Sequence, residues 1–122
     1  CSPWKVEATE RALNGLRGWI TGISRSDAKT RTATPFVEVL TTGMVKVAPL
    51  AAWTSKQLHE YMVQHDLPYH PLWHQGYTSI GCWPCTQKPI DPNDPRSGRW
   101  AGQDKTECGI HDIGKPQAAE AD

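Results

Sequence analysis

Two segments of the chain carry apolar residues with a helical period. Residues 7–17 are predicted to form a helix, because their apolar side chains recur three or four positions apart. Gly15 and Gly18 are expected to end it. The members of its apolar face are Ala8, Ala12, Leu13 and Leu16.

The second helix is the clearer of the two. It is predicted to begin after Thr54, because Thr54 and Gln57 form a Thr-x-x-Gln capping box. Pro68 and Pro71 are expected to stop it, since proline cannot continue a helix. Its predicted face consists of Leu58, Tyr61, Met62 and His65.

Short β-branched and aromatic runs predict strands between these helices. Residues 19–21 read as one strand, and residues 36–40 and 44–47 read as a pair of strands joined by a turn at 41–43. A polar loop over residues 24–34 separates the first strand from the pair.

The rest of the chain lacks sustained periodicity. Residues 71–108 are rich in Gly, Pro and Trp, and a long irregular region in a compact domain is usually functional or disordered. Its aromatic residues and two cysteines favour function. We predict a single domain over residues 1–111 and a disordered polar tail over residues 112–122.

Composition narrows the function classes. Lys plus Arg and Asp plus Glu both total 13, so the formal net charge is zero and we expect no nucleic-acid partner. No apolar run reaches the roughly 20 residues that cross a bilayer, so we expect no membrane association. With no signal peptide, we expect a cytoplasmic protein. The chain opens on Cys1, and we expect it to be part of a longer protein.

The cysteines are the main candidates for chemistry. Cys82 and Cys85 form a C-x-x-C, a spacing that serves both metal sites and redox dithiols. Cys1 is a further potential ligand. Cys108 lies in Glu-Cys-Gly-Ile-His, where Lys105 and His111 would favour a reactive thiolate. Its local sequence alone, however, is more typical of an inert buried thiol.

Basic and imidazole side chains provide weaker candidates. Arg96 and Arg99 stand three residues apart in a turn and could bind phosphate or sulfate, although such pairs are commonly solvated. The remaining histidines show no ligand spacing, and we expect no functional role for His59, His65, His70 or His74.

Several separated motifs together carry a resemblance to a known family. They are W-I-T-G-I, K-V-A-P-L-A-A-W-T, L-P-Y-H-P-L-W-H-Q-G-Y-T-S-I-G-C-W-P-C-T, R-S-G-R-W-A-G and K-T-E-C-G-I-H. In this order they resemble the adenylyl-sulfate (APS) and phosphoadenylyl-sulfate (PAPS) reductases over residues 1 to about 111. The matching residues correspond to the C-terminal half of the proteins in that family.

The resemblance implies a role for each candidate residue. Cys108 would be the catalytic nucleophile, and Cys1, Cys82 and Cys85 would be ligands of a [4Fe-4S] cluster. Substrate binding would fall to Lys5, Arg25, Arg31, Arg96, Arg99 and His111. The chain departs from the family pattern at Trp4 and Ser24, where relatives usually carry arginine.

The resemblance also implies a fold and a reaction. The fold would be the C-terminal part of an α/β adenine-nucleotide alpha-hydrolase-like (PP-loop) domain, without its phosphate-binding loop. The reaction would be thioredoxin-dependent reduction of adenylyl sulfate to sulfite and AMP in sulfate assimilation, through an S-sulfo group on Cys108. The oligomeric state, including a homo-oligomer, stays open.

Three alternatives are kept. The first is phosphoadenylyl-sulfate reductase, with the same chemistry on the 3′-phosphorylated substrate, although that branch generally lacks the cluster cysteines. The second is a non-enzymatic zinc module that uses Cys1, Cys82, Cys85 and Cys108. The third is a sulfur-transfer relative that modifies nucleic acid, against which the terminal E-C-G-I-H argues.

Overall fold

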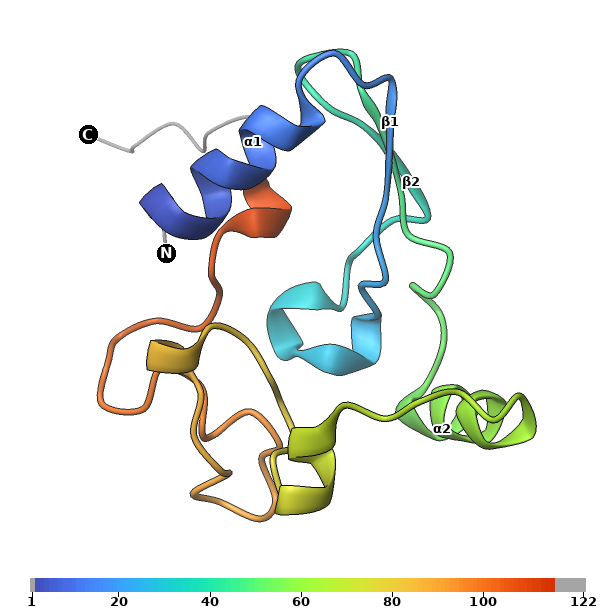
Figure 1. Ribbon diagram of the computed structural model, residues 1–122. Helices are drawn as coiled ribbons and strands as arrows, with labels where there is room; N and C mark the ends of the chain where they lie inside the picture. The colour runs from blue at the N-terminus through green and yellow to red at the C-terminus, as the bar shows by residue number, and fades with distance from the viewer. Residues whose placement is uncertain (1, 116–122) are drawn as a thin grey trace. The chain divides into compact units, whose positions relative to one another are not determined.

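The structure is a computed structural model that describes residues 2–115 (Figure 1). These residues form two compact units. The sheet unit contains residues 2–54 and 107–115, and the loop unit contains residues 55–106. The α/β class predicted from the sequence is confirmed by this arrangement of helices and a sheet.

The N-terminal helix of the sheet unit is shorter than its periodicity predicted. A π-helical turn, η1 (Ser2–Val6), leads into α1 (Glu7–Leu13). Gly15 takes a left-handed conformation with φ of 79° just after the helix, which a residue without a side chain adopts at little cost. Leu13 is therefore the buried residue of α1, and Leu16 lies beyond the helix and is exposed.

Three short strands form the sheet. They are β1 (Gly18–Ile20), β2 (Val37–Val39) and β3 (Val45–Val47), in the spatial order β1-β3-β2. β2 and β3 are antiparallel, which confirms the predicted strand pair. β1 runs parallel to β3, and its register places Trp19 opposite Lys46.

The two faces of this sheet differ in an unexpected way. Register brings Trp19, Lys46 and Glu38 side by side on one face, and Lys46 in the centre is only 5% exposed. Alternate positions, which point to the opposite face, carry valine and isoleucine, yet Ile20 and Val39 are 77% and 70% exposed. The polar face is thus the packed one, and the apolar face is open.

Two small apolar clusters complete the sheet unit. Leu13, Leu40 and Met44 pack together with the partly buried Trp19 and Ile113. The second cluster contains Ile23, Ala48 and Ala51. Among residues 2–115, no large side chain is fully buried.

The last described residues belong to this core. Ile113 packs on the first cluster, and the carbonyl of Gly114 accepts hydrogen bonds from the backbone and hydroxyl of Thr41 at 2.9 and 3.0 Å. Residues 112–115, which the sequence assigned to the tail, therefore make defined contacts. Residues 116–122 lie outside the described part of the chain.

The loop unit contains one α-helix and irregular chain. Helix α2 (Ser55–Gln64) starts directly after Thr54, as predicted, and is followed by the 3₁₀ turns η4 (Pro71–Gln75) and η5 (Trp83–Cys85). A single β-bridge joins Thr86 to Arg99. The irregular character predicted for residues 71–108 is confirmed.

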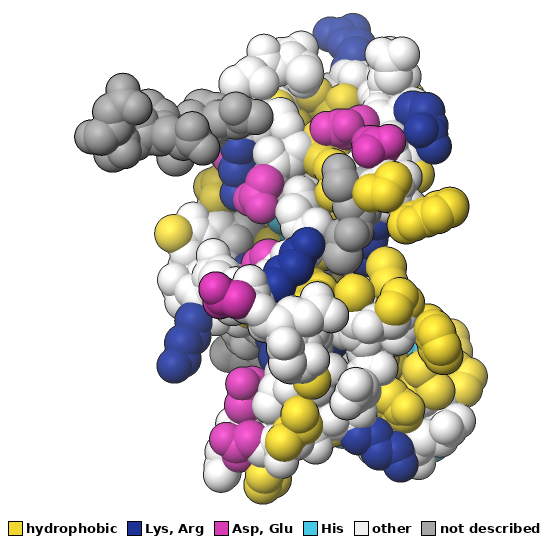
Figure 2. Space-filling view, turned by 90° about the vertical axis from the view of Figure 1, so that its left-hand side faces the viewer, with side chains coloured by type: hydrophobic (Ala, Val, Ile, Leu, Met, Phe, Trp, Pro, Cys, Tyr) yellow, Lys and Arg dark blue, Asp and Glu magenta, His cyan; other side chains and the backbone are white. Residues whose placement is uncertain are grey.

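On the face shown in Figure 2, basic and acidic side chains are interspersed. Within residues 2–115, no helix has both the length and the apolar character that a bilayer crossing requires.

Candidate functional site

The segment around Cys108 belongs to the sheet unit. Cys108 is a half-buried free thiol. Gly109 follows it with φ of 83°, in the left-handed region, and the short turn η6 (Ile110–Asp112) comes next. The glycine allows the chain to turn sharply after the thiol, so that Cys108 sits at a bend between Glu107 and η6.

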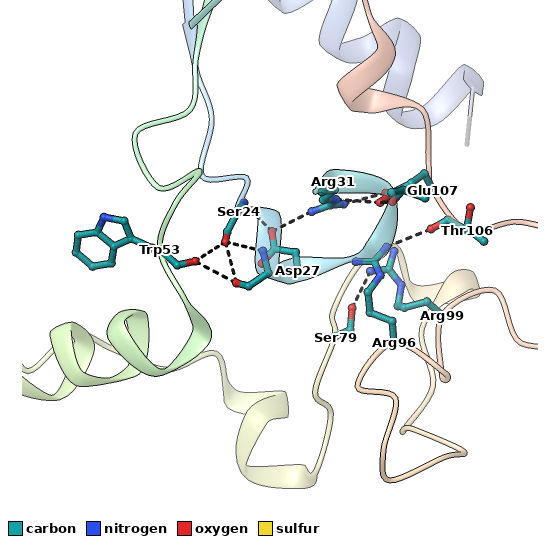
Figure 3. Close-up of polar contacts among 11 residues, drawn as sticks. Ser24, Asp27, Arg31, Trp53, Ser79, Arg96, Arg99, Thr106 and Glu107 are labelled. Atoms are coloured by element: carbon teal, nitrogen blue, oxygen red, sulfur yellow. Dashed lines mark hydrogen bonds and ion pairs between the residues drawn. The ribbon is translucent and has the colours of Figure 1, made fainter. Parts of the chain in front are cut away.

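Glu107 attaches this segment to the turn η3 (Lys29–Arg31) (Figure 3). Its two carboxylate oxygens accept hydrogen bonds from Arg31 Nε and Nη2 at 2.9 and 2.8 Å. The hydroxyl of Thr30 donates a further bond of 2.8 Å to Oε1. Such a two-pronged pairing fixes both distance and orientation.

Arg31 is held by a second carboxylate as well. Its Nη1 lies 3.1 Å from Asp27 Oδ2. Burial by itself lowers the pKa of Arg31, but the hydrogen bonds and charge of Glu107, with a contribution from Asp27, leave the pKa raised above its ordinary value. The guanidinium is thus charged and engaged by two acidic side chains.

The turn η2 (Arg25–Asp27), which carries Asp27, is fixed by the buried Ser24. Ser24 N donates to Asp27 Oδ2 at 2.9 Å, and Ser24 Oγ donates to the carbonyl of Trp53 at 2.7 Å (Figure 3). Ser24 stands where the resembling family often has arginine. In this chain the position serves as a helix cap.

The other end of the Cys108 segment rests on the polar face of the sheet. Lys46 Nζ donates to the carbonyl of His111 at 2.8 Å and lies 4.8 Å from the centre of the Trp19 ring. The imidazole of His111 stacks on Trp19 with ring centres 6.0 Å apart and an angle of 10°. Glu38 contributes a carboxylate 3.9 Å from Lys46 Nζ.

Burial changes the protonation of this group. It lowers the pKa of His111 to about 4, and the positive charges of Arg31 and Lys46 act in the same direction. Burial, together with Lys115, also lowers the pKa of Lys46. His111 is therefore neutral at pH 7, and its buried Nδ1 has no hydrogen-bond partner within residues 2–115.

The remaining basic candidates of the sheet unit have different surroundings. Arg25 donates from Nε to the carbonyl of Thr34 at 2.8 Å, and its guanidinium lies 5.1 Å from the centre of the Phe36 ring. Lys5 is half-buried in η1.

The C-x-x-C motif lies in the loop unit. Cys82 and Cys85 are half-buried free thiols at the two ends of η5, and Cys85 N donates to the carbonyl of Cys82 at 2.9 Å. Thr86 Oγ1 donates to the same carbonyl at 2.9 Å and accepts from Gly81 N at 3.1 Å. The two cysteines thus belong to one short hydrogen-bonded turn, and Trp83 between them is 91% exposed.

Arg99 supports this turn from its far end. Its Nε donates to the carbonyl of Cys85 at 3.1 Å, and its Nη1 donates to Ser79 Oγ at 3.3 Å (Figure 3). The guanidinium lies 4.4 Å from the centre of the ring of Trp100, which is only 3% exposed. Gly81 makes room for it, since an added Cβ would overlap the guanidinium.

Arg96 is placed on the same aromatic side chain. Its guanidinium lies 5.7 Å from the centre of the Trp100 ring, and Nη2 donates to the carbonyl of Thr106 at 3.2 Å (Figure 3). Two of the arginines predicted to bind substrate therefore both lie against the ring of Trp100. Trp100 itself has φ of 51°, a strained conformation for a residue with a side chain.

The structure therefore distributes the predicted residues over two groups. The sheet unit brings together Cys108, His111 and Arg31, and the loop unit brings together Cys82, Cys85, Arg96 and Arg99. Cys1 lies outside the described residues. Within residues 2–115, no group of three or more His, Cys, Asp or Glu side chains is arranged to hold a metal ion. Cys82 and Cys85 on one turn fit two ligands of a larger site.

Sequence reasoning missed several residues that organise these groups. Glu107, Asp27, Lys46 and Trp19 carry the contacts around Cys108. Lys46 could have been suspected, because a lysine between two valines in a strand must either reach solvent or find partners. Glu107 had no such signal, because its partner lies far away in the sequence.

Comparison with known proteins identifies the family. Residues 1–88, well over half of the chain, match the phosphoadenosine phosphosulfate reductase domain. The chain belongs to this family. The matching span contains the C-x-x-C motif, and Cys108 lies beyond it.

Individual reductases extend the match toward the C-terminus. The adenosine 5'-phosphosulfate reductase of Rhodococcus opacus is 46% identical over 112 residues, which cover 91% of this chain and 45% of that protein. The protein of the same name from Mycobacterium tuberculosis is 49% identical over 112 residues, covering 91% and 44%. A match of this length leaves only the ends of the chain unmatched, so it spans both Cys82 and Cys108.

A solved member of the reductase family shares the fold. The crystal structure of phosphoadenylyl-sulfate (PAPS) reductase from Candida auris, in a phosphate complex, matches with a TM-score of 0.55 and 35% identity. It covers 65% of this chain and 38% of that chain. The chain thus has an α/β fold of the PAPS reductase type and spans less than half the length of the curated relatives.

Proposed function

We propose that the protein reduces adenylyl sulfate to sulfite and AMP in sulfate assimilation, with thioredoxin as reductant and Cys108 as nucleophile. The observation that carries the proposal is a half-buried free thiol within a segment that matches reductases of this name. The cytoplasm, where thiols stay reduced, suits such chemistry.

The first step forms a bond between sulfur atoms. The Cys108 thiolate attacks the sulfur of the sulfate group, and the bond between that sulfur and the bridging phosphate oxygen breaks. AMP leaves with the electron pair, and the sulfo group stays on Cys108. Two negatively charged groups meet in this step, so nearby cations lower the barrier.

The second step releases the product. A thioredoxin thiolate attacks Cys108 Sγ, and sulfite leaves with the electron pair of the sulfur–sulfur bond. The second thioredoxin thiol then attacks the mixed disulfide and restores the Cys108 thiolate. The substrate sulfur is reduced by two electrons, and thioredoxin is oxidised to its disulfide.

The basic residues divide into two groups in this proposal. Arg96, Arg99 and Lys5 are proposed to bind the substrate anion, as the family resemblance implies. Arg99 supports this role best, because its guanidinium donates to a carbonyl and a hydroxyl and lies against the ring of Trp100. Arg25 is proposed to assist from its position over Phe36. His111 offers a neutral imidazole, which could donate a hydrogen bond to a sulfate oxygen.

A [4Fe-4S] cluster is proposed for Cys82 and Cys85, with Cys1 as a third ligand. The turn of η5 and its support by Arg99 favour two thiolates held at fixed spacing. When bound, the cluster would cross-link separate parts of the chain through its cysteine ligands. Iron and sulfide analysis of anaerobically purified intact protein tests this, and stoichiometric zinc without visible absorbance would reject it.

The decisive experiment follows the sulfo group. The intact protein is incubated with adenylyl [³⁵S]sulfate without reductant, and labelled protein is quantified by mass spectrometry and radioactivity. We expect labelling of Cys108, its loss in Cys108→Ser, and full labelling in the matched surface variant Asp104→Asn. Label that persists in Cys108→Ser would exclude Cys108 as nucleophile.

Reduction of the 3′-phosphorylated substrate is the second candidate. It is favoured by the structural match to a protein named as phosphoadenylyl-sulfate reductase. Turnover of the two substrates in parallel separates the candidates, and the branch is decided by the larger kcat/KM.

A further inference from the structure

The contacts of Arg31 raise a question about its role. The family resemblance assigns it to the substrate, but two carboxylates already occupy its guanidinium. Its pairing with Glu107 uses both carboxylate oxygens at 2.8 and 2.9 Å, and Glu107 directly precedes Cys108. Because two carboxylates already balance its charge, Arg31 would attract a further anion only weakly.

The pairing has the geometry of an attachment. Arg31 belongs to η3, which is fixed by Asp27 and the capping interactions of Ser24. Glu107 belongs to the C-terminal segment, 76 positions away in the sequence. Because the pair is partly buried, solvent and salt screen it less than an exposed ion pair.

A second contact holds the opposite side of the thiol. Lys46 donates to the carbonyl of His111, whose ring lies on Trp19. Cys108 and Gly109 thus form a short bend between two fixed points. Loss of the Glu107 contact would leave only one of these points and let the bend swing outward.

We propose that Glu107 and Arg31 are positioning residues that dock the Cys108 segment on the sheet unit. The ion pair holds the Cys108 thiol in place for sulfur transfer. It dissociates when the reductant must reach the thiol from solution. The proposal rests on the proposed function for its purpose. The docking itself is measurable without any substrate.

Thiol alkylation provides the test, because a docked thiol reacts more slowly than a released one. Iodoacetamide labelling of Cys108 in the intact protein is followed by mass spectrometry of the peptide that contains it. We expect Glu107→Gln and Arg31→Met each to accelerate labelling about tenfold, the effect of losing a partly buried charged pair. The reversed pair Arg31→Glu/Glu107→Arg should return the rate toward the original, and Asp104→Asn should not change it.

The two single variants separate docking from a simple charge effect on the thiol. Removal of a negative charge would raise the thiolate fraction, and removal of a positive charge would reduce it. An effect on charge alone therefore predicts opposite changes in Glu107→Gln and Arg31→Met. Opposite changes, or no change in either, would overturn the proposal.

Amide hydrogen exchange checks that the rest of the unit stays folded. Exchange should rise over residues 107–112 in Glu107→Gln and stay the same in β3. An equal rise in β3 would make Arg31 and Glu107 general structural residues and would also overturn the proposal. If Cys108 proved not to be the nucleophile, labelling by adenylyl sulfate would fail while these alkylation rates would be unaffected.

Discussion

Two arginines organise the two cysteine regions of this molecule, and they do so by different means. Arg31 holds the Cys108 segment through carboxylates, with Glu107 and Asp27 as partners. Arg99 holds the C-x-x-C turn through a carbonyl and a hydroxyl, and its charge rests on the indole of Trp100. Two carboxylates balance the charge of the first arginine, whereas the second donates to neutral groups and lies on an aromatic ring.

This difference separates positioning from electrostatics. A guanidinium between two carboxylates contributes geometry and little net field. A guanidinium that donates to a carbonyl and a hydroxyl and packs on an aromatic ring is also held in place. Because these partners are neutral, it keeps an electrostatic field that attracts anions. The contrast explains why Arg99 is the better candidate for the substrate, although the sequence presents both as basic loop residues.

The substitution with the largest expected effect disrupts the backbone next to Arg99. Gly98 lies against the backbone of Gln87 and Lys88, and an added Cβ would overlap both carbonyl oxygens. Because backbone cannot yield as a side chain can, Gly98→Ala should lower the free energy of unfolding by about 3 kcal/mol. Urea denaturation measures it. Gly22→Ala, where an added Cβ meets nothing within 4 Å, should change it by less than about 0.5 kcal/mol.

A smaller effect is expected from changing Arg99 itself. Arg99→Lys keeps the charge but loses the planar fork that reaches Cys85 and Ser79 and covers Trp100. We expect a loss of about 1–2 kcal/mol in the free energy of unfolding. Arg17→Lys, at an exposed position, serves as the control. Equal effects of the two substitutions would show that Arg99 needs only its charge.

The smallest expected effect concerns pH and should be confined to the Cys108 region. His111 faces Arg31, Lys46, Glu107 and Asp112, and burial lowers its pKa to about 4. Between that value and the ordinary 6.5, the unfolded chain binds more protons than the folded one. The contribution of His111 to stability is therefore complete above pH 6.5 and is lost as the pH falls toward 4.

An NMR titration of the His111 ring and urea denaturation at pH 7 and pH 5 measure this effect. The drop between the two pH values should shrink in His111→Gln. The contacts of Arg99 involve a carbonyl, a hydroxyl and an indole, none of which titrates in this range. If η5 lost protection against amide exchange to the same extent as residues 107–112 when the pH falls, the separation of the two regions would be contradicted.

The local pattern of the sequence predicted much of the fold. The pair formed by β2 and β3 and the start of α2 follow from alternation and capping, which depend on residues close in the chain. The parallel pairing of β1 with β3 did not follow, because a crossover connection leaves no local signal. The end of α1 at Leu13 was also missed, since Gly15 stops the helix before the apolar period ends.

The candidate site was predicted unevenly for the same reason. Cys82, Cys85, Arg96 and Arg99 stand close in the sequence, and the structure also places them in one unit. The assignment of Cys108 came from the family resemblance rather than from its neighbours. The partners of the Cys108 segment, Arg31 and Lys46, are 76 and 65 positions from the residues that they hold.

The sequence by itself determined that the chain belongs to this reductase family, where its short strands lie, and which thiols carry the candidate chemistry. Only the tertiary structure decided which face of the sheet is packed and what Arg31 binds. Alternation defines two faces but does not say which one is covered. The returning C-terminal segment covers the face of Trp19 and Lys46, because the Lys46 amine donates to the carbonyl of His111 there and lies beside the carboxylate of Glu38.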